Sequence, residues 1–230
     1  MDKDRKKLLD AYDDLRVCDV RDGLDALGYH FYGSMSPDLR PLYRTRAYGL
    51  AKTVRYLPHR GRIEYRNPRH YRDEYTPYYY KEVCIYPWGE EIEEGDFVVI
   101  DQSGQNVGLI GSENSFGYTI AGMRGMVING GVRDTDEIIL QDIPVWSTMV
   151  SQPMVQGRLE FESMNQPVCV GGVNVHPGDM VVADGDGVVV VPREIAMEVA
   201  QYAHEEHEGD KRSRRLKYEA TGRKLDETVL

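Results

Sequence analysis

Short apolar runs, separated by turn-forming residues, occupy the middle and the second half of the chain. They are rich in valine and have the length of buried β-strands, and Gly-Asp turns punctuate them. The four clearest runs are Phe97–Ile100, Val168–Val170, Met180–Val182 and Val188–Val191. The Asp and Gly residues at 177–179 and 184–187 have a spacing similar to that of calcium loops, but their position between valine runs favours tight turns.

Helical periodicity is expected in residues 5–27, 114–123 and 193–218. Strands and helices together predict an α/β domain. A chain of 230 residues is long enough to bury a substantial core, although only 41% of its residues are hydrophobic. We therefore expect one domain over residues 1–200, followed by a charged helical tail at 201–230.

The expected tail contains HEEH at 204–207 and KRSRR at 211–215. His204 and His207 would lie on one face of a helix, where two histidines can hold a metal. So many charges are more typical of a solvated helix, which we favour, and contact with another subunit is the second choice.

Composition narrows the class of protein. No apolar run reaches the length of about 18 residues that a membrane helix needs, and the charged amino terminus lacks the apolar region of a signal peptide, so we expect a cytoplasmic protein without membrane contact. A net charge of −10 makes general nucleic-acid binding unlikely. Cys18, Cys84 and Cys169 are too widely spaced to suggest a zinc site or a disulfide framework.

Residues 55–80 are a local exception to the acidic composition, because arginines alternate there with tyrosines and two histidines. Such a segment can pack between subunits, cover an anionic substrate or bind RNA through phosphate contacts and base stacking. Pro58, Pro68 and Pro77 favour an irregular loop over a regular helix.

Candidate chemistry is concentrated in residues 108–137. Met126–Ile128 is predicted to be a buried strand that ends in a turn at Asn129–Gly131, so Arg133 and Asp134 would stand side by side at its mouth. A guanidinium group offers a planar fork of donors to a carboxylate, and an aspartate oxygen is a suitable ligand for Mg²⁺. The pair could therefore hold a small keto acid and its metal together.

Residues 111–115 of the same region are expected to open a helix that Ser112 or Asn114 would cap. The first turn of a helix carries unpaired N–H groups and the positive end of its dipole. We therefore expect Gly111, Ser112, Glu113 and Asn114 to form a cradle for a substrate carboxylate.

Several long segments resemble one known family. GLIGS and GMVINGGVRDTDEI in the candidate region, PVCVGGVNVHPGDMVVADGDGVVVVPRE at 167–194 and RVCDVRDGLDALG at 16–28 are similar to the 4-hydroxy-4-methyl-2-oxoglutarate (HMG) aldolases and the related regulator of ribonuclease activity A (RraA). The resemblance covers most of residues 10–200. It implies a compact swivelling β/β/α fold with a mixed sheet, and homotrimers or homohexamers whose active sites lie near subunit interfaces.

The resemblance also implies an activity. In the aldolases an Arg-Asp pair serves the site, and the RNase E inhibitor lacks that aspartate. Asp134 would hold Mg²⁺ or Mn²⁺ and Arg133 would bind the pyruvate part of a 2-keto acid. The expected protein is a metal-dependent class II-type aldolase or decarboxylase, which breaks a carbon–carbon bond through a metal-stabilised enolate.

One position departs from the family pattern. The aldolases have an acidic residue where this chain has Ser112, so either Glu113 replaces it or the substrate differs. Two alternatives to the aldolase therefore stay open: a non-catalytic regulator that binds a ribonuclease, and an enzyme of the same fold that acts on another hydroxy or keto acid. Asp134 argues against the regulator.

Overall fold

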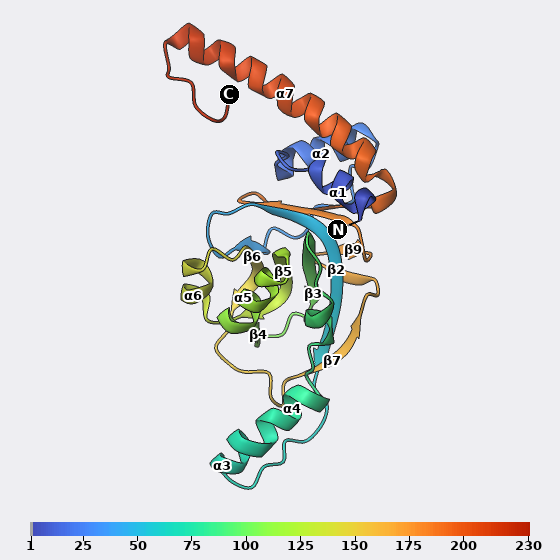
Figure 1. Ribbon diagram of the computed structural model, residues 1–230, viewed down its shortest axis with the longest axis vertical. Coiled ribbons are helices and arrows are strands. Elements are labelled where there is room, and N and C mark those ends of the chain that lie inside the picture. The colour runs from blue at the N-terminus through green and yellow to red at the C-terminus, as the bar shows by residue number, and fades with distance from the viewer. Residues whose placement is uncertain (1) are drawn as a thin grey trace.

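A nine-stranded sheet forms the centre of the molecule, and its long strand β2 is strongly curved (Figure 1). The computed structural model describes residues 2–230. The strand order is β1-β6-β5-β3-β2-β10-β11, with β4 paired to β5 and β7 paired to β2. The strands of this sheet are β1 (Arg40–Pro41), β2 (Ala47–Pro58), β3 (Asp96–Asp101), β4 (Gly108–Ile110), β5 (Met123–Val132), β6 (Val145–Val150), β7 (Leu159–Met164), β10 (Met180–Asp184) and β11 (Gly187–Val191).

The sheet is mixed. Its centre pairs β2, β3, β5 and β6 in parallel, whereas β7, β10 and β11 are antiparallel to their neighbours. All six residues of β3 are buried, as is usual for a parallel strand covered on both faces. The remaining strands, β8 (Val168–Val170) and β9 (Val173–Val175), form a separate hairpin. The α/β expectation is confirmed, and all four predicted apolar runs lie in strands.

Helices cover one end of the sheet (Figure 1). α1 (Lys3–Asp10) and α2 (Val17–Ala26) lie beside α7 (Ala196–Thr221), and the three share a core cluster with β10 and β11. The approach of α2 to α7 is close, because a Cβ atom at Gly23 would lie 2.6 Å from the carbonyl oxygen of Val199.

The single helix expected over residues 5–27 is wrong. The chain breaks between α1 and α2 because Arg46, from outside this segment, donates to the carbonyl oxygens of Tyr12 at 3.0 Å, Leu15 at 3.1 Å and Asp13. These hydrogen bonds replace those that a continuous helix would make. The side chain of Asp19 then accepts from the backbone N–H of Arg16 at 2.9 Å and opens α2.

The irregular loop expected within residues 55–80 is also wrong in part. After β2, only residues 59–67 are irregular, and a continuous helical stretch follows: α3 (Pro68–His70), the π-helical turn η1 (Tyr71–Tyr75) and α4 (Thr76–Glu82). Pro68 is compatible because it stands at the first helical position, where its missing N–H costs nothing. The π-turn precedes Pro77, whose missing N–H an ordinary helix could not accommodate. This segment projects from the end of the molecule opposite α7 (Figure 1).

The other two expected helices are present with different bounds. The helix expected at 114–123 is α5 (Ser112–Ile120), which stops before Gly122, a residue with φ of +114°. The helix expected at 193–218 begins with a 3₁₀ turn, η3 (Arg193–Ile195), and continues as α7. A further 3₁₀ turn, η2 (Pro87–Glu91), and a short helix, α6 (Thr135–Leu140), complete the fold.

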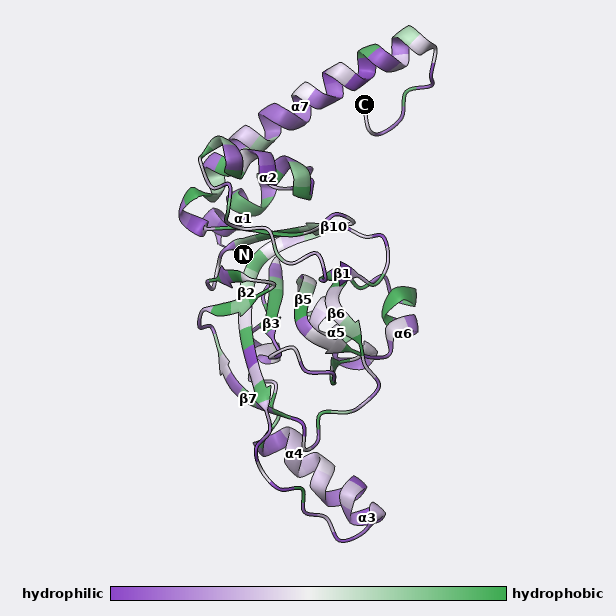
Figure 2. Cartoon of the chain, turned by 180° about the vertical axis from the view of Figure 1, so that it is seen from behind, coloured by the Kyte–Doolittle hydropathy of each residue, from purple (hydrophilic) through white to green (hydrophobic). Residues whose placement is uncertain are grey.

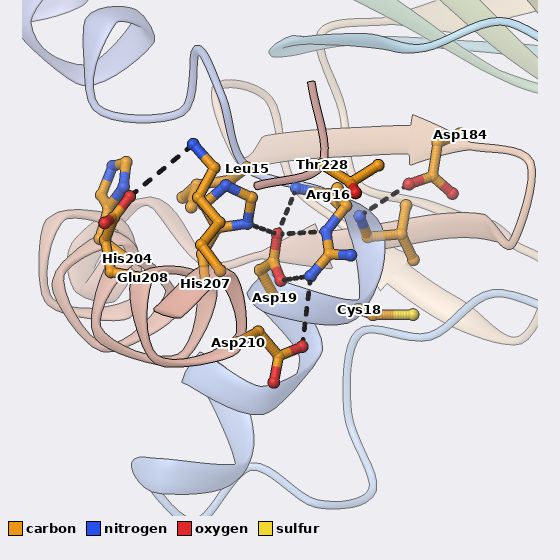
Figure 3. A network of polar contacts seen from close by, with 12 residues as sticks. Leu15, Arg16, Cys18, Asp19, Asp184, His204, His207, Glu208, Asp210 and Thr228 are labelled. Carbon is orange, nitrogen blue, oxygen red and sulfur yellow. Dashed lines mark hydrogen bonds and ion pairs between the residues drawn. The ribbon is translucent and has the colours of Figure 1, made fainter. Parts of the chain in front are cut away.

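A partly buried network of polar contacts joins α2 to α7 (Figure 3). Asp19 lies at its centre, with Arg16 Nε 2.9 Å and His207 Nδ1 2.9 Å from its Oδ2 atom. Burial alone would raise the pKa of Asp19, but the hydrogen bonds from Arg16 outweigh it and hold this pKa below its usual value. His204 contacts the carbonyl oxygen of Ala11 at 3.0 Å. Both histidines therefore hold α7 against the domain. The expected solvated helix is confirmed only for the outer half of α7, which is mostly hydrophilic (Figure 2).

Within residues 2–230 no helix combines the length and the apolar character needed to cross a bilayer. All three cysteines are free thiols; Cys84 is buried, and the other two are exposed.

Candidate functional site

A cavity of about 490 Å³ lies where α5, β4 and the start of α6 meet. Its lining comes from five parts of the chain, which range from α4 to the loop after β6. The lining residues are Tyr80, Tyr86, Gly108, Leu109, Gly111, Glu113, Asn114, Tyr118, Arg133, Asp134 and Met154. The structure thus brings five of the six predicted site residues to one cavity; the sixth, Ser112, does not line it.

The strand that leads to the Arg-Asp pair is longer than expected. The turn predicted at Asn129–Gly131 is wrong, because β5 continues through these residues to Val132. Its glycines permit close packing instead. A Cβ atom added to Gly130 would lie 2.6 Å from the side chain of Gln102, and one added to Gly131 would lie 2.0 Å from Ser151 Oγ. The strand therefore carries Arg133 directly to the cavity.

Arg133 and Asp134 are fixed mainly through the backbone. The N–H group of Arg133 donates to the carbonyl oxygen of Ile110 at 2.9 Å. Asp134 has φ of 54° and ψ of 38°, a left-handed conformation uncommon for a residue other than glycine, and it is the N-cap residue of α6. Arg133 Nε lies 3.2 Å from Asp134 Oδ1, and about one third of each side chain is exposed.

Two glycines of the β4 loop make room for these side chains. A Cβ atom at Gly108 would lie 2.8 Å from Arg133 Cβ, and one at Gly111 would lie 2.4 Å from Asp134 Oδ2. The backbone of this loop therefore approaches both charged side chains more closely than any other residue type would allow.

The start of α5 differs in detail from the expectation. Gly111 is the N-cap residue, and Asn114 Oδ1 accepts from its N–H group at 2.9 Å, so Asn114 has the expected capping role. The expectation that Ser112 caps this helix is wrong. Ser112 is buried, and its Oγ donates to the carboxylate of Glu137 on α6. Gly111, Glu113 and Asn114 line the cavity at the positive end of α5.

Glu137 is a carboxylate that the sequence analysis missed. It lies in the first turn of α6, three residues after the N-cap residue Asp134, and its N–H group donates to the carbonyl oxygen of Asp134 at 3.2 Å. Glu137 also approaches the position where the family pattern has an acidic side chain, because Ser112 binds it.

Three tyrosines on one wall of the cavity were missed as well. Tyr86 Oη donates to the carbonyl oxygen of Leu109 at 3.0 Å, and the ring of Tyr118 packs on Trp88 with centroids 4.6 Å apart. Burial raises the pKa of Tyr80, Tyr86 and Tyr118, so all three are neutral at physiological pH. Tyr80 is the last residue of the Arg/Tyr-rich segment, which therefore reaches the cavity.

The carboxylate of Asp134 is a type of ligand that a hard divalent cation accepts. This carboxylate is partly exposed beside a cradle that a Cβ atom at Gly111 would fill. Among residues 2–230 there is no cluster of three or more His, Cys, Asp or Glu side chains suited to a metal. A small number of carboxylates supplemented by water is the usual environment of Mg²⁺, whereas structural zinc needs four ligands.

Comparisons with known proteins identify the family of the chain. A family model described as "RraA-like: Aldolase/RraA" matches residues 17–190. The chain is 38% identical over 91 residues to a "Putative 4-hydroxy-4-methyl-2-oxoglutarate aldolase" of Deinococcus radiodurans, which covers 40% of this chain and 52% of the relative. A protein of the same name from Halalkalibacterium halodurans is 30% identical over 123 residues, which cover 52% and 57%. The matches thus span little more than half the length of these relatives.

Among solved structures, the chain resembles Streptomyces coelicolor RraAS2, described as an unusual member of the RNase ES inhibitor RraA protein family. The TM-score is 0.74 at 25% sequence identity, and the match covers 90% of this chain and 96% of RraAS2. The fold is therefore shared with a protein named for ribonuclease inhibition as well as with proteins named for aldol chemistry.

Proposed function

The chain belongs to the RraA-like family, and from this premise we propose that the protein is a divalent-metal-dependent lyase that cleaves a carbon–carbon bond of a pyruvate-type 2-keto acid. Aldol cleavage of a substrate similar to HMG and decarboxylation of oxaloacetate are the two reactions in question. The carrying observation is that Arg133 and Asp134 stand together on the wall of one cavity, beside the start of α5.

Each part of the site has a separate task in this proposal. Arg133 binds and orients the substrate carboxylate through its fork of donors, and the first N–H groups of α5 add a second set of donors. Asp134 would hold Mg²⁺ or Mn²⁺. The bound cation would supply Lewis-acid stabilisation of the charge that develops on the 2-keto oxygen. The tyrosines and Leu109 limit the access of water to the reacting carbons.

The test is pyruvate release by the purified protein from HMG and from oxaloacetate, with and without Mg²⁺ or Mn²⁺. A blank with metal alone is needed, because free metal ions also accelerate oxaloacetate decarboxylation. We expect metal-dependent release that Arg133→Ala abolishes. Calorimetric titration with Mn²⁺ gives a second measurement, in which binding should be lost in Asp134→Asn. Equal turnover in wild type and both variants would refute the proposal.

The resemblance to RraAS2 favours a second function, a non-catalytic regulator that binds a ribonuclease. The lyase needs the Asp134 carboxylate to hold the metal. A regulator does not need it, because a carboxylate inside a glycine-lined cradle adds nothing to a docking surface. Absence of turnover with every keto acid, together with binding of a purified ribonuclease that survives Asp134→Asn, would favour the regulator. Turnover of a different hydroxy or keto acid would keep the site and change only the substrate.

Assembly is part of the same proposal. Apolar side chains on α5 and α6, next to the cavity, are exposed in the single chain; they are Phe116, Ile120, Ile139 and Leu140. An exposed apolar patch is typical of a subunit interface. We propose a homotrimer or homohexamer whose contacts include these helices, which light scattering coupled to gel filtration would measure. A charged residue at Leu140 should then reduce the molar mass to that of the single chain.

A further inference from the structure

The Arg/Tyr-rich segment continues past β2 as an arm, residues 59–82, which projects from the domain at the end opposite α7 (Figure 1). The structure describes every residue of this arm, and apart from Tyr80 they do not line the cavity of the proposed lyase. The proposed function therefore leaves most of the arm without a task.

The arm carries a surplus of positive charge in an acidic protein. It has six Arg and Lys residues against four Asp and Glu residues, a net charge of +2, whereas the whole chain has −10. All four carboxylates lie within 3.8 Å of a basic group of the arm itself, in the pairs Arg62–Glu64, Arg72–Asp73, His70–Glu74 and Lys81–Glu82. Arg60, Arg66 and Arg69 are exposed and form no ion pair among residues 2–230. Three cations of the arm are thus free for an anionic partner.

Tyrosine rings form a continuous row along the arm. Tyr65 lies 5.0 Å from Tyr71 between ring centroids, and Tyr71 is stacked on Tyr75 at 5.9 Å. Tyr78 lies 6.4 Å from Tyr75. The first and last members of the row, Tyr65 and Tyr78, are 50% and 54% exposed. Exposed aromatic rings next to free cations are the platforms on which the bases of a single nucleic-acid strand stack.

The hydroxyl groups of these four tyrosines are also available. Within residues 2–230 none of them takes part in a hydrogen bond, whereas the hydroxyl of the buried Tyr79, in the same helical stretch, donates to the carbonyl oxygen of Leu159 at 2.7 Å. A phenol hydroxyl can donate to or accept from the 2′-hydroxyl group of a ribose, which DNA lacks. This chemistry favours RNA over DNA.

A hollow next to the row has the size and the donors and acceptors for a base. It measures about 520 Å³, and its lining residues are Arg62, Glu64, His70, Glu74, Tyr75 and Tyr78. The rings can stack on a base, and the two carboxylates can accept from an exocyclic amino group. Both carboxylates keep lone pairs for this contact, because their ion pairs of 3.6 Å and 3.8 Å are longer than hydrogen bonds.

We propose that the arm binds single-stranded RNA. Arg60, Arg66 and Arg69 contact phosphates, Tyr65 and Tyr78 stack on bases, and one base enters the hollow. A second copy of the chain is a poorer partner, because the cores of protein interfaces are depleted of charged side chains and ten of the 24 residues of the arm are charged. This binding does not depend on the proposed lyase reaction.

Fluorescence anisotropy with a labelled oligo(A) RNA of about twelve nucleotides and the full chain tests the proposal, since adenine offers both a ring and an amino group. We expect a Kd of about 10 µM in about 50 mM NaCl. Three phosphate contacts predict that Kd rises about 20-fold when the salt is raised to about 200 mM. Absence of binding at about 100 µM protein in the lower salt would refute the proposal.

Charge variants locate the contact. The triple variant Arg60→Gln/Arg66→Gln/Arg69→Gln should raise Kd at least about 20-fold in the lower salt and remove most of the salt dependence. The triple change of the same arginines to lysine should keep Kd within about threefold, because lysine also binds phosphate.

The matched control removes the same charge from α7 and the segment that follows it. Its three changes, all at exposed positions, are Arg212→Gln, Lys217→Gln and Lys224→Gln. We expect this control to change Kd less than threefold. A loss of binding equal to that of the arm variant would mean that only the total charge matters, and would refute the proposal.

Ring variants and other strands test the stacking. Tyr78→Leu should raise Kd about tenfold and Tyr78→Phe less than threefold, whereas Tyr29→Leu, at a 38% exposed tyrosine outside the arm, should leave Kd unchanged. Duplex RNA should bind at least about tenfold more weakly, because its bases are already stacked and paired. Equal binding of the duplex would refute the stacking, and equal binding of oligo(dA) would refute the assignment to RNA.

Two further measurements separate this proposal from the others. Light scattering coupled to gel filtration should give the same molar mass for wild type and the triple glutamine variant; a lower mass in the variant would make the arm a subunit contact and overturn the proposal. Pyruvate release should be equal in both proteins, because the three arginines do not line the cavity. RNA binding without any turnover would refute the lyase alone, and turnover without RNA binding would refute this proposal alone.

Discussion

Asp19 and Asp134 show two opposite ways of placing a carboxylate in this molecule. Asp19, between α2 and α7, has a side chain only 3% exposed and is surrounded by Arg16 and His207 (Figure 3). Asp134, at the cavity, is 36% exposed and has one neighbouring cation, Arg133, whose Nε lies 3.2 Å away. The carboxylate of Asp19 is therefore occupied by contacts within the protein, whereas that of Asp134 keeps lone pairs available for a ligand.

The supporting structure differs in the same way. Asp19 is held by other side chains, so its charge contributes to the docking of α7. Asp134 is held by backbone geometry: a left-handed φ, the N-cap position of α6 and the missing Cβ of Gly111. A charged group held by the backbone can bind a ligand without first breaking hydrogen bonds to other side chains. Substitutions should therefore affect activity at Asp134 and stability at Asp19.

The largest effect is expected for Asp134→Asn. Loss of the metal-binding charge should lower kcat/KM about 10³-fold, or about 4 kcal/mol, while the melting temperature changes little. Steady-state pyruvate release and thermal unfolding measure the two sides of this expectation. Asp136→Asn is the matched control, because Asp136 is exposed on the same helix and does not line the cavity. A large fall in melting temperature with activity retained would reverse the comparison.

Asp19→Asn should have the second largest effect, and on stability alone. Removing the charge takes the carboxylate partner from the almost buried His207 and leaves Arg16 only the more distant Asp210, 3.8 Å away, which should lower the free energy of unfolding by about 2 kcal/mol. Urea denaturation measures this loss, and kcat/KM should stay within about twofold at 25 °C. Asp22→Asn, on the exposed side of α2, is the control and should change stability by less than about 0.5 kcal/mol.

The pH dependence of stability gives an independent test of Asp19. The pKa of Asp19 in the folded protein is lower than its ordinary value of 3.8. Its contribution to the free energy of unfolding is therefore complete above pH 3.8 and is lost as the pH falls through the folded pKa. Wild type should therefore lose more stability than Asp19→Asn below about pH 4, and the difference between them should narrow in acid. A constant difference between pH 7 and pH 3 would contradict this assignment.

Gly111→Ala should have a smaller effect and should act on activity. The backbone at Gly111 is extended, so alanine is tolerated there, but its Cβ would lie 2.4 Å from Asp134 Oδ2 and must displace the carboxylate. We expect kcat/KM to fall about tenfold, or about 1.4 kcal/mol, with a nearly unchanged melting temperature. Gly117→Ala in the same helix meets open space and should leave activity as it is.

Ser112→Ala should have the smallest effect. It removes one hydrogen bond to Glu137, whose side chain is exposed and can turn to water, so stability should fall by less than about 1 kcal/mol and kcat/KM by less than about threefold. Kinetics and thermal unfolding measure both values. A loss of activity as large as that of Asp134→Asn would show that Ser112 itself takes part in catalysis.

Local patterns predicted much of the fold. The valine-rich runs are strands, and the Asp184–Gly187 turn joins β10 to β11 because Gly and Asp tolerate tight turns. One helix prediction and one loop prediction failed for identifiable reasons. Residues 5–27 break because Arg46 takes their carbonyl groups, and residues 68–82 are helical because a π-turn accommodates Pro77. Both causes depend on geometry that periodicity does not contain.

The sequence by itself determined the chemical types at the site: an Arg-Asp pair after an apolar strand, and glycines before a helix. These features are local, since Arg133 and Asp134 are neighbours and residues 111–115 form one turn. Only the tertiary structure decided what surrounds them. Tyr80, Tyr86 and Tyr118 come from separate elements, and Ser112 meets Glu137 across 25 positions. Such contacts arise from packing around a common core, which no short sequence pattern records.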